Sequence, residues 1–210
     1  PWVTLAIDIA TRLVTGYHVS FEAPSRLSIA LCLTRAVAPK AELLADLESK
    51  AEWPAQGKPR SIHVDNGSDF QSRVFKGACA EWGIDLRYRP PGSPHFGGHI
   101  ERLIGTMMGA VHLLPGTTQS SVAAKGSYDA EAMATMTLSE FDSWFALEIC
   151  RYNNSIHSSL GCTPVAKWEA LSGEMAGDIP FDMEAFRVSF LPSELRQVRR
   201  DGIHLFDLRY

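Results

Sequence analysis

The sequence has little cysteine, no excess of basic residues and no long apolar run. Its four cysteines are widely spaced and form no CxxC pair or Cys/His cluster, which argues against a zinc site and favours the reduced thiols of a cytosolic protein. No apolar run approaches the roughly 18 residues needed to span a membrane, so no membrane association is expected. The net charge of −4 is unlike the basic footprint of a stand-alone nucleic-acid binder.

No leader segment is visible in these residues, since the first of them already resemble a strand. Position 1 is proline rather than an initiating methionine, so this absence carries little weight. The chain is nevertheless rich enough in apolar residues to build a core. They make up 45% of 210 residues, with five tryptophans and ten phenylalanines, which is enough for one substantial domain and a smaller piece.

Hydrophobic periodicity and turn residues predict a mixed α/β order. The predicted strands span 3–9, 13–22, 61–65 and 84–90, and the predicted helices span 25–37, 40–50, 72–83, 99–114, 137–152 and 163–171. The first two predicted strands follow one another directly, as in a hairpin. The later strands are separated by predicted helices. This order favours a mixed sheet with helices on both faces.

The hydrophobic pattern of the sequence changes near Gly177. Residues 185–210 alternate in the manner of β-structure, so we divide the chain into a domain at 1–176 and the start of a second, β-rich domain at 177–210. The polar segment from residue 115 to about 135 is predicted to be an excursion from the first domain.

An acidic residue interrupts the most apolar predicted strand. In VTLAIDIATR, Asp8 lies among valine, leucine, isoleucine and alanine, where an unpaired carboxylate is costly. One interpretation is a bond to a backbone amide or to an arginine such as Arg12. The other is a divalent metal ion, held together with carboxylates from elsewhere in the chain.

Two further carboxylates are candidates for the same site. Asp65 closes the strand SIHVD before an Asn-Gly turn, and Glu101 lies early in the helix after a Gly- and Pro-rich loop. Gly97 and Gly105 flank Glu101 on the helix, so a ligand can come close. The alternatives are that Asp65 only forms the turn and that Glu101 is only a charged residue on the helix surface. Together the three carboxylates match the oxygen ligands that Mg²⁺ prefers.

The context of these carboxylates resembles a known family. The stretches LAIDIATR, IHVDNGSDF and PGSPHFGGHIERLIGTM, with 35 residues between Asp65 and Glu101, resemble the D,D-35-E transposases and retroviral integrases of the ribonuclease-H-like superfamily. The segment RYNNSIHSSLGCTPVAKWEAL resembles a motif that follows the core in bacterial members. TLSEFDSWFALEICRYNN and the terminal LRQVRRDGIHLFDLRY are similar to the phage Mu transposase branch.

The resemblance implies a fold, a reaction and a cofactor. The fold is a ribonuclease-H-like, mixed five-stranded sheet flanked by helices and followed by a small β-barrel. Asp8, Asp65 and Glu101 are implied to bind two Mg²⁺ ions, for which Mn²⁺ can substitute. With them the family hydrolyses a 3′ transposon end, and the freed hydroxyl attacks target DNA without a covalent enzyme–DNA intermediate.

Other polar residues are candidates for DNA contacts. Asn66, His99 and Arg102 are placed beside the carboxylates, and each has an alternative as a turn former or surface residue. Arg87 and Arg89 are also within possible reach of phosphates. For Tyr152, Asn153, His157 and Trp168, packing between the last helices and the core is the preferred interpretation.

The resemblance also implies partners and a compartment. They are transposon-end and target DNA, a multimer on that DNA, a target-selecting ATPase, and a bacterial cytoplasmic location near the nucleoid. Two alternatives stay open: a ribonuclease-H-like nuclease or resolvase, and a non-catalytic relative that binds DNA or partner proteins.

Overall fold

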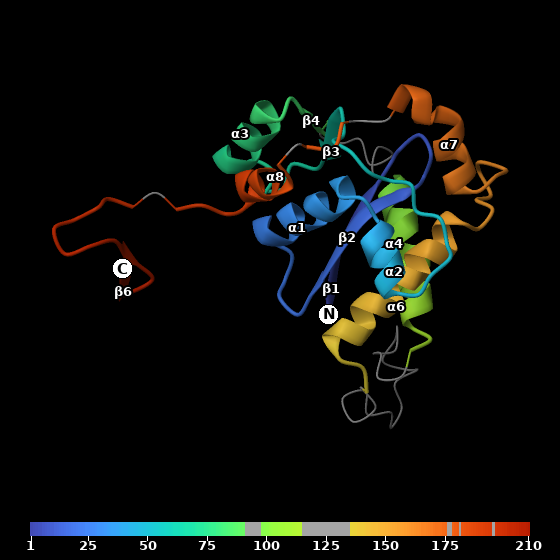
Figure 1. Ribbon diagram of the computed structural model, residues 1–210, viewed down its shortest axis with the longest axis horizontal. Helices are drawn as coiled ribbons and strands as arrows, with labels where there is room; N and C mark the ends of the chain where they lie inside the picture. The colour runs from blue at the N-terminus through green and yellow to red at the C-terminus, as the bar shows by residue number, and fades with distance from the viewer. Residues whose placement is uncertain (91–97, 115–134, 176–177, 181, 195) are drawn as a thin grey trace.

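The computed structural model describes residues 1–90, 98–114, 135–175, 178–180, 182–194 and 196–210. Figure 1 labels the elements discussed below. The strands are β1 (Trp2–Ile7), β2 (Val14–Ser20), β3 (Ser61–Val64), β4 (Asp85–Tyr88), β5 (His204–Leu205) and β6 (Leu208–Arg209). The helices are α1 (Arg26–Val37), α2 (Ala41–Asp46), α3 (Arg73–Glu81), α4 (Gly98–Val111), α6 (Leu138–Asn153), α7 (Pro164–Met175) and α8 (Met183–Phe190).

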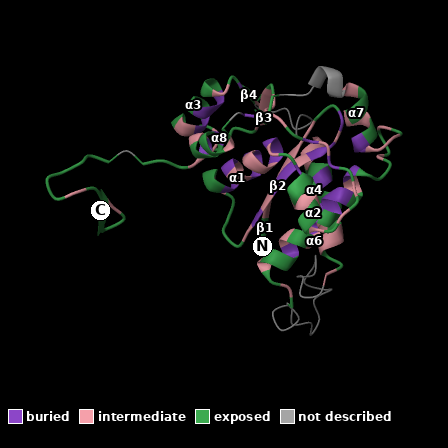
Figure 2. Ribbon diagram, viewed as in Figure 1, coloured by how far each residue is buried: buried purple, intermediate pink, exposed green. Residues whose placement is uncertain are grey.

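The β1–β2 hairpin runs through the middle of the molecule (Figure 1). Its strands are antiparallel, with Trp2 opposite Ser20 and Leu5 opposite Tyr17, and the register shifts between Ala6 and Ile7. Helix α1 packs on the hairpin, as do α4 against β1 and α6 against β2. Figure 2 shows buried residues gathered where these helices meet the hairpin. The hairpin is therefore the centre of the main core.

A glycine lets α1 come close to β2. A Cβ added to Gly16 would lie 2.5 Å from the backbone nitrogen of Ala36 in α1, well inside van der Waals contact. Ser25 caps the start of α1 and Thr137 the start of α6, each in a capping box. Both helix starts agree with the sequence-based expectation.

The second pair of strands is built around a crossover helix. β3 and β4 are parallel, with Ser61 opposite Asp85 and Val64 opposite Tyr88, and α3 lies between them in the chain. Apolar side chains of α1, α3 and α8 form a second core with the residues flanking these strands. Its buried members include Val37, Phe75, Ile84, Phe186 and Phe190.

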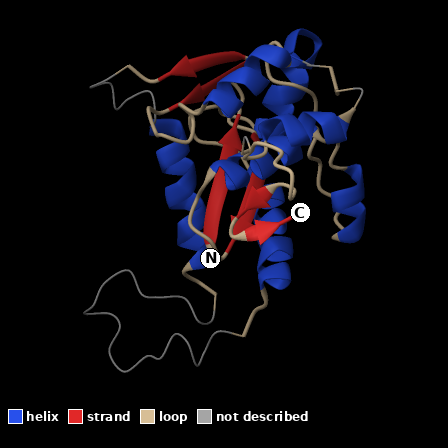
Figure 3. Cartoon of the chain, turned by 90° about the vertical axis from the view of Figure 1, so that its left-hand side faces the viewer, coloured by secondary structure: helices blue, strands red, loops and turns tan. Residues whose placement is uncertain are grey.

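The expected five-stranded sheet is not formed by the described residues, which contain three separate two-stranded sheets. Figure 3 shows the β3–β4 pair running across the upper end of the β1–β2 hairpin rather than beside it. The physical reason is that an alternating pattern specifies which face of a strand is buried but not which strand lies next to it. Two cores and the close contact of α1 with β2 decide the pairing here.

The expected β-structure after residue 185 is also wrong at its beginning. Residues Met183–Phe190 form helix α8, with Asp182 as N-cap accepting a hydrogen bond of 2.8 Å from the Ala185 amide. Phe186 and Phe190 are buried, whereas Val188 between them is 54% exposed. Apolar residues two apart suggested a strand, but the pair four apart is the one that packs. The predicted boundary at residues 176–177 lies outside the described residues and stays a prediction.

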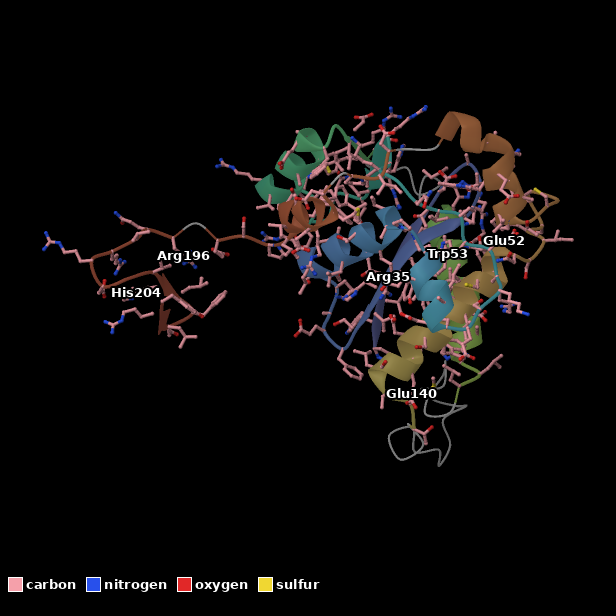
Figure 4. All side chains as sticks on the ribbon, viewed as in Figure 1. Arg35, Glu52, Trp53, Glu140, Arg196 and His204 are labelled. Carbon is pink, nitrogen blue, oxygen red and sulfur yellow. The ribbon has the colours of Figure 1, made fainter. Side chains whose placement is uncertain are left out.

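The C-terminal residues form an arm that extends away from the body (Figure 1). A short hairpin of β5 and β6 ends it, and Figure 4 shows Arg196 and His204 on this arm, far from Arg35 and Trp53 at the core. In the part of the chain that the structure describes, no helix is both long and apolar enough to cross a membrane. All four cysteines are free, as expected.

Candidate functional site

Asp8 follows the first strand instead of lying within it, which corrects the sequence-based expectation. β1 ends at Ile7, and the chain turns so that the Asp8 amide donates to the Leu13 carbonyl at 2.8 Å. Oδ1 of Asp8 accepts hydrogen bonds from the amide (2.8 Å) and the hydroxyl (2.7 Å) of Thr11, which is fully buried. Among the described residues, Oδ2 accepts none. One carboxylate oxygen therefore fixes the turn and the other is available to a ligand.

Asp65 holds a second turn at the end of β3. Its Oδ1 accepts a hydrogen bond of 2.8 Å from the Gly67 amide, as in an Asx turn. The side chain is exposed. A Cβ on Gly67 would lie 2.9 Å from that same oxygen, so only glycine fits here without displacing the carboxylate.

Glu101 points toward the end of β4. Its carboxylate, 63% exposed, lies 3.8 Å from the Arg89 guanidinium. The Arg89 carbonyl accepts a hydrogen bond of 3.0 Å from the Asn66 side chain, and the Arg89 amide donates to Val64. Arg89 thus connects the turn after β3 to α4.

The elements that carry the three carboxylates contact one another. α4 packs on β1, which ends at Ile7 just before Asp8, and Arg89 joins α4 to the turn that begins at Asp65. The side chains themselves do not converge: among the described residues, no group of three or more His, Cys, Asp or Glu side chains is arranged to hold a metal ion. Metal binding by these carboxylates remains a prediction.

The three candidate DNA contacts have internal partners. Asn66 bonds to Arg89 as described, and the Arg102 guanidinium lies 3.0 Å from Nδ1 of His99. Arg102 is exposed and His99 partly buried. The further candidate Arg87 pairs with Asp85 at 2.6 Å. All of these residues keep exposed surface, and their contact with DNA stays a prediction.

Asn153 is a structural residue, as predicted. It is fully buried; its Oδ1 accepts from the Val14 amide at 2.9 Å and its Nδ2 donates to the Val14 carbonyl at 3.2 Å. This pair of bonds holds the end of α6 against the beginning of β2. Residues just after Asn153 are thereby placed beside the turn that contains Asp8 and Arg12.

Comparison with known proteins places this chain in a family. The family model described as the TnsB C-terminal domain matches residues 1–116, more than half of the chain. The chain belongs to this family. The matched residues include Asp8, Asp65 and Glu101.

Two proteins of transposition are similar over the whole of this chain. The transposase of Tn552 from Staphylococcus aureus is 28% identical over 212 residues. The Tn7 transposition protein TnsB from Escherichia coli is 23% identical over 227 residues. The chain spans 41% of the first relative and 32% of the second. Among solved structures, the catalytic core of BIV integrase overlaps 81% of this chain and 87% of its own, at 18% identity and a TM-score of 0.47.

Proposed function

We propose that this chain is the catalytic core of a DNA transposase that transfers phosphoryl groups. In this proposal Asp8, Asp65 and Glu101 are the catalytic carboxylates of a ribonuclease-H-like core of the Mu-like branch. Water cleaves the phosphodiester bond at the 3′ end of the transposon and frees a 3′-hydroxyl. This hydroxyl then attacks a phosphodiester bond of the target DNA, and a 3′-hydroxyl of the target strand leaves. The observation that carries the proposal is the connection through Arg89, which links the turn of Asp65 to Glu101 on the helix that packs against β1.

Family membership supports the same proposal. Residues 1–116, which hold all three carboxylates, match the TnsB C-terminal domain, and two proteins of transposition are similar along the whole chain. We extend this to partners as well: transposon-end and target DNA, a multimer on that DNA, and an ATPase that selects the target. A bacterial cytoplasmic location near the nucleoid follows from the same reasoning.

The donor chemistry suits Mg²⁺ or Mn²⁺, although the arrangement is incomplete. Carboxylate oxygens are the ligands of such ions, and Asp8 and Asp65 each use only Oδ1 in a turn. Glu101 instead lies beside Arg89. We propose that Glu101 exchanges Arg89 for the metal when DNA binds. Two ions would stabilise the attacking and leaving oxygens, and the chain supplies the turns that orient the two aspartates.

Metal dependence tests this function. The full chain is incubated with labelled DNA duplexes and with supercoiled plasmid as the target. The duplexes carry the two end sequences of the mobile element that encodes the protein. We expect cleaved 3′ ends and joined products with Mg²⁺ or Mn²⁺, and none in EDTA. Products that form in EDTA would contradict the proposal. Hydrolysis without joining would instead indicate the nuclease alternative.

Gly67 is expected to position Asp65. The Gly67→Ala substitution places a Cβ 2.9 Å from Oδ1 of Asp65, so the carboxylate must move. We expect cleavage and joining to fall by about tenfold or more, because small displacements at reacting centres cost up to roughly 100-fold. Thermal melting should change little, since Gly67 is exposed.

The matched control is Gly77→Ala in α3, where an added Cβ meets nothing within 4 Å. This variant should keep full activity. If Gly67→Ala is equally active, the turn does not position the catalytic carboxylate.

A further inference from the structure

Four basic groups lie on segments that pack together around the turn of Asp8. Arg12 lies in that turn, His99 and Arg102 lie in the first turns of α4, and His157 follows α6. Three contacts set this arrangement: α4 packs on β1 and on α6, and Asn153 ties the end of α6 to Val14. We call Arg12, His99, Arg102 and His157 the basic cluster. Its members come from three separate parts of the chain.

Side-chain contacts order the cluster. Arg102 lies 3.0 Å from Nδ1 of His99, and Nδ1 of His157 lies 3.1 Å from the Ser159 hydroxyl. The His157 ring stands edge-on to Tyr152 with centroids 6.1 Å apart. Burial, and after it the charges of Arg12 and Arg102, lowers the pKa of both His99 and His157. The charges of both arginines thus act on both imidazoles, and Arg102 contacts His99 directly.

Across the ranges that the structure describes, the two arginines of the cluster form no ion pair with a carboxylate, even though Asp8 lies in the same turn as Arg12 and Glu101 precedes Arg102. Many other arginines do, among them Arg35 with Asp142 at 3.0 Å. The like charges of Arg12 and Arg102 repel one another because, among the described residues, neither is neutralised by an ion pair. An external anion would relieve this repulsion.

Arg12 occupies its position at a conformational cost. Its φ is 62°, in the left-handed region that glycine adopts without strain. The Arg12 amide donates to the Asp8 carbonyl at 2.9 Å, and its guanidinium donates to the Ile9 carbonyl. Glycine would preserve the amide bond and relax the backbone. A strained residue with a long cationic side chain is more simply explained by a ligand than by the turn.

We propose that the basic cluster binds one backbone phosphate of the DNA substrate, adjacent to Asp8, with Arg12 and Arg102 as its main donors. The proposal rests on the proposed function for the identity of the ligand. Guanidinium groups suit phosphate oxygens because they donate two hydrogen bonds at once, and the imidazoles add neutral donors. The site positions the strand and reads no sequence.

Metal-free DNA binding tests the cluster. Fluorescence anisotropy measures Kd of the full chain for a fluorescein-labelled duplex of about 30 bp and mixed sequence, in EDTA at about 50–200 mM NaCl. We expect Arg12→Gly and Arg102→Gln each to weaken binding about tenfold and to reduce the slope of log Kd against log [NaCl] by about one. His157→Gln should weaken binding about threefold.

Stability separates a ligand role from a structural one. Arg12→Gly should melt at or above the temperature of the unsubstituted chain, because its φ suits glycine. Arg73→Gln on α3 and His18→Gln on β2 are matched controls outside the cluster and should leave Kd unchanged. Unchanged Kd in both cluster arginine variants, equal losses in the controls, or no binding by the unsubstituted chain would each overturn the proposal.

The binding assay is independent of the proposed chemistry. If the cluster variants lose binding while no cleavage occurs with any metal, the catalytic proposal fails and the phosphate site stands. If cleavage and joining occur but the variants bind DNA normally, the phosphate site fails alone.

Discussion

Asp65→Asn is expected to abolish cleavage and joining, with a loss of about 1,000-fold or more, while the fold is kept. Asparagine retains the oxygen that accepts from the Gly67 amide, so the turn persists. It removes the negative charge that a divalent cation needs, and charge stabilisation at the reacting oxygens is usually the largest part of catalysis. Asp8→Asn and Glu101→Gln should give losses of the same order.

Stability should be unchanged or slightly higher in these variants. The amide oxygen that Asp8→Asn introduces would still accept the two hydrogen bonds from Thr11, and the exposed Glu101–Arg89 pair contributes little. Removing one carboxylate also relieves any repulsion among the three. Gel assays of joined product, paired with thermal melts, measure both effects.

Asp69→Asn is the matched control for Asp65. Asp69 lies four residues further along the same loop and pairs at 3.6 Å with Arg26 at the start of α1. This variant should keep its activity. Activity within a few-fold of the unsubstituted chain in Asp8→Asn, Asp65→Asn or Glu101→Gln would remove that residue from the proposed triad.

Lys40 is expected to make the free energy of unfolding depend strongly on pH. Its side chain is 4% exposed and lies 5.8 Å from the Trp53 ring centroid. Burial, and after it the charge of Arg35, lowers the pKa of Lys40 to about 7. Its Nζ donates to the carbonyls of Ala36 at 3.2 Å, Ala38 at 2.6 Å and Ala55 at 2.8 Å. These carbonyls favour the ammonium, and desolvation outweighs them.

The sign follows from proton binding. Between pH 7 and about 10, the unfolded chain holds a proton on Lys40 that the folded chain has released, so stability rises with pH. Relative to Lys40→Met, which cannot titrate, the unsubstituted chain should gain about 1 kcal/mol per pH unit over this window. Below about pH 7 the difference should level off.

Urea unfolding of both proteins from about pH 6 to pH 10 measures this difference. Lys76→Met serves as the control, because Lys76 is exposed on α3. Its difference from the unsubstituted chain should not change with pH. A difference for Lys40→Met that stays flat from about pH 6 to pH 9 would show that the three carbonyls keep Lys40 charged when buried.

The sequence predicted single elements better than their assembly. Ser25 before α1, Thr137 with Glu140 at the start of α6 and Thr163 before Pro164 in α7 are local signals, because a cap depends on residues three positions apart. Sheet pairing depends on contacts distant in sequence, and the described residues form three two-stranded sheets instead of the predicted five-stranded one. The helix of Phe186 and Phe190 was missed because these two residues, with Val188 between them, fit both the two-residue period of a strand and the four-residue spacing of a helix face.

For the candidate site, too, the sequence indicated single residues, whereas the structure was needed to show their contacts. Composition and motif spacing pointed to Asp8, Asp65 and Glu101 and to the family. They did not show that Asp8 lies in a turn held by Thr11, or that Glu101 faces Arg89. Arg12 and His157 were assigned other roles, since nothing local connects residues so far apart in the chain. A long cationic side chain in a tight turn after a strand was the signal that could have drawn attention to Arg12.

The sequence by itself determined which residues are proposed to carry the chemistry, because motif spacing and residue type are properties of the chain. It also determined most helix ends, because caps are local. Only the tertiary structure decided how the strands pair, where α8 packs, and which charges meet. The basic cluster exists because Asn153 fastens α6 to Val14 and α4 lies across β1. Such neighbours are chosen by packing of distant segments, which no local pattern encodes.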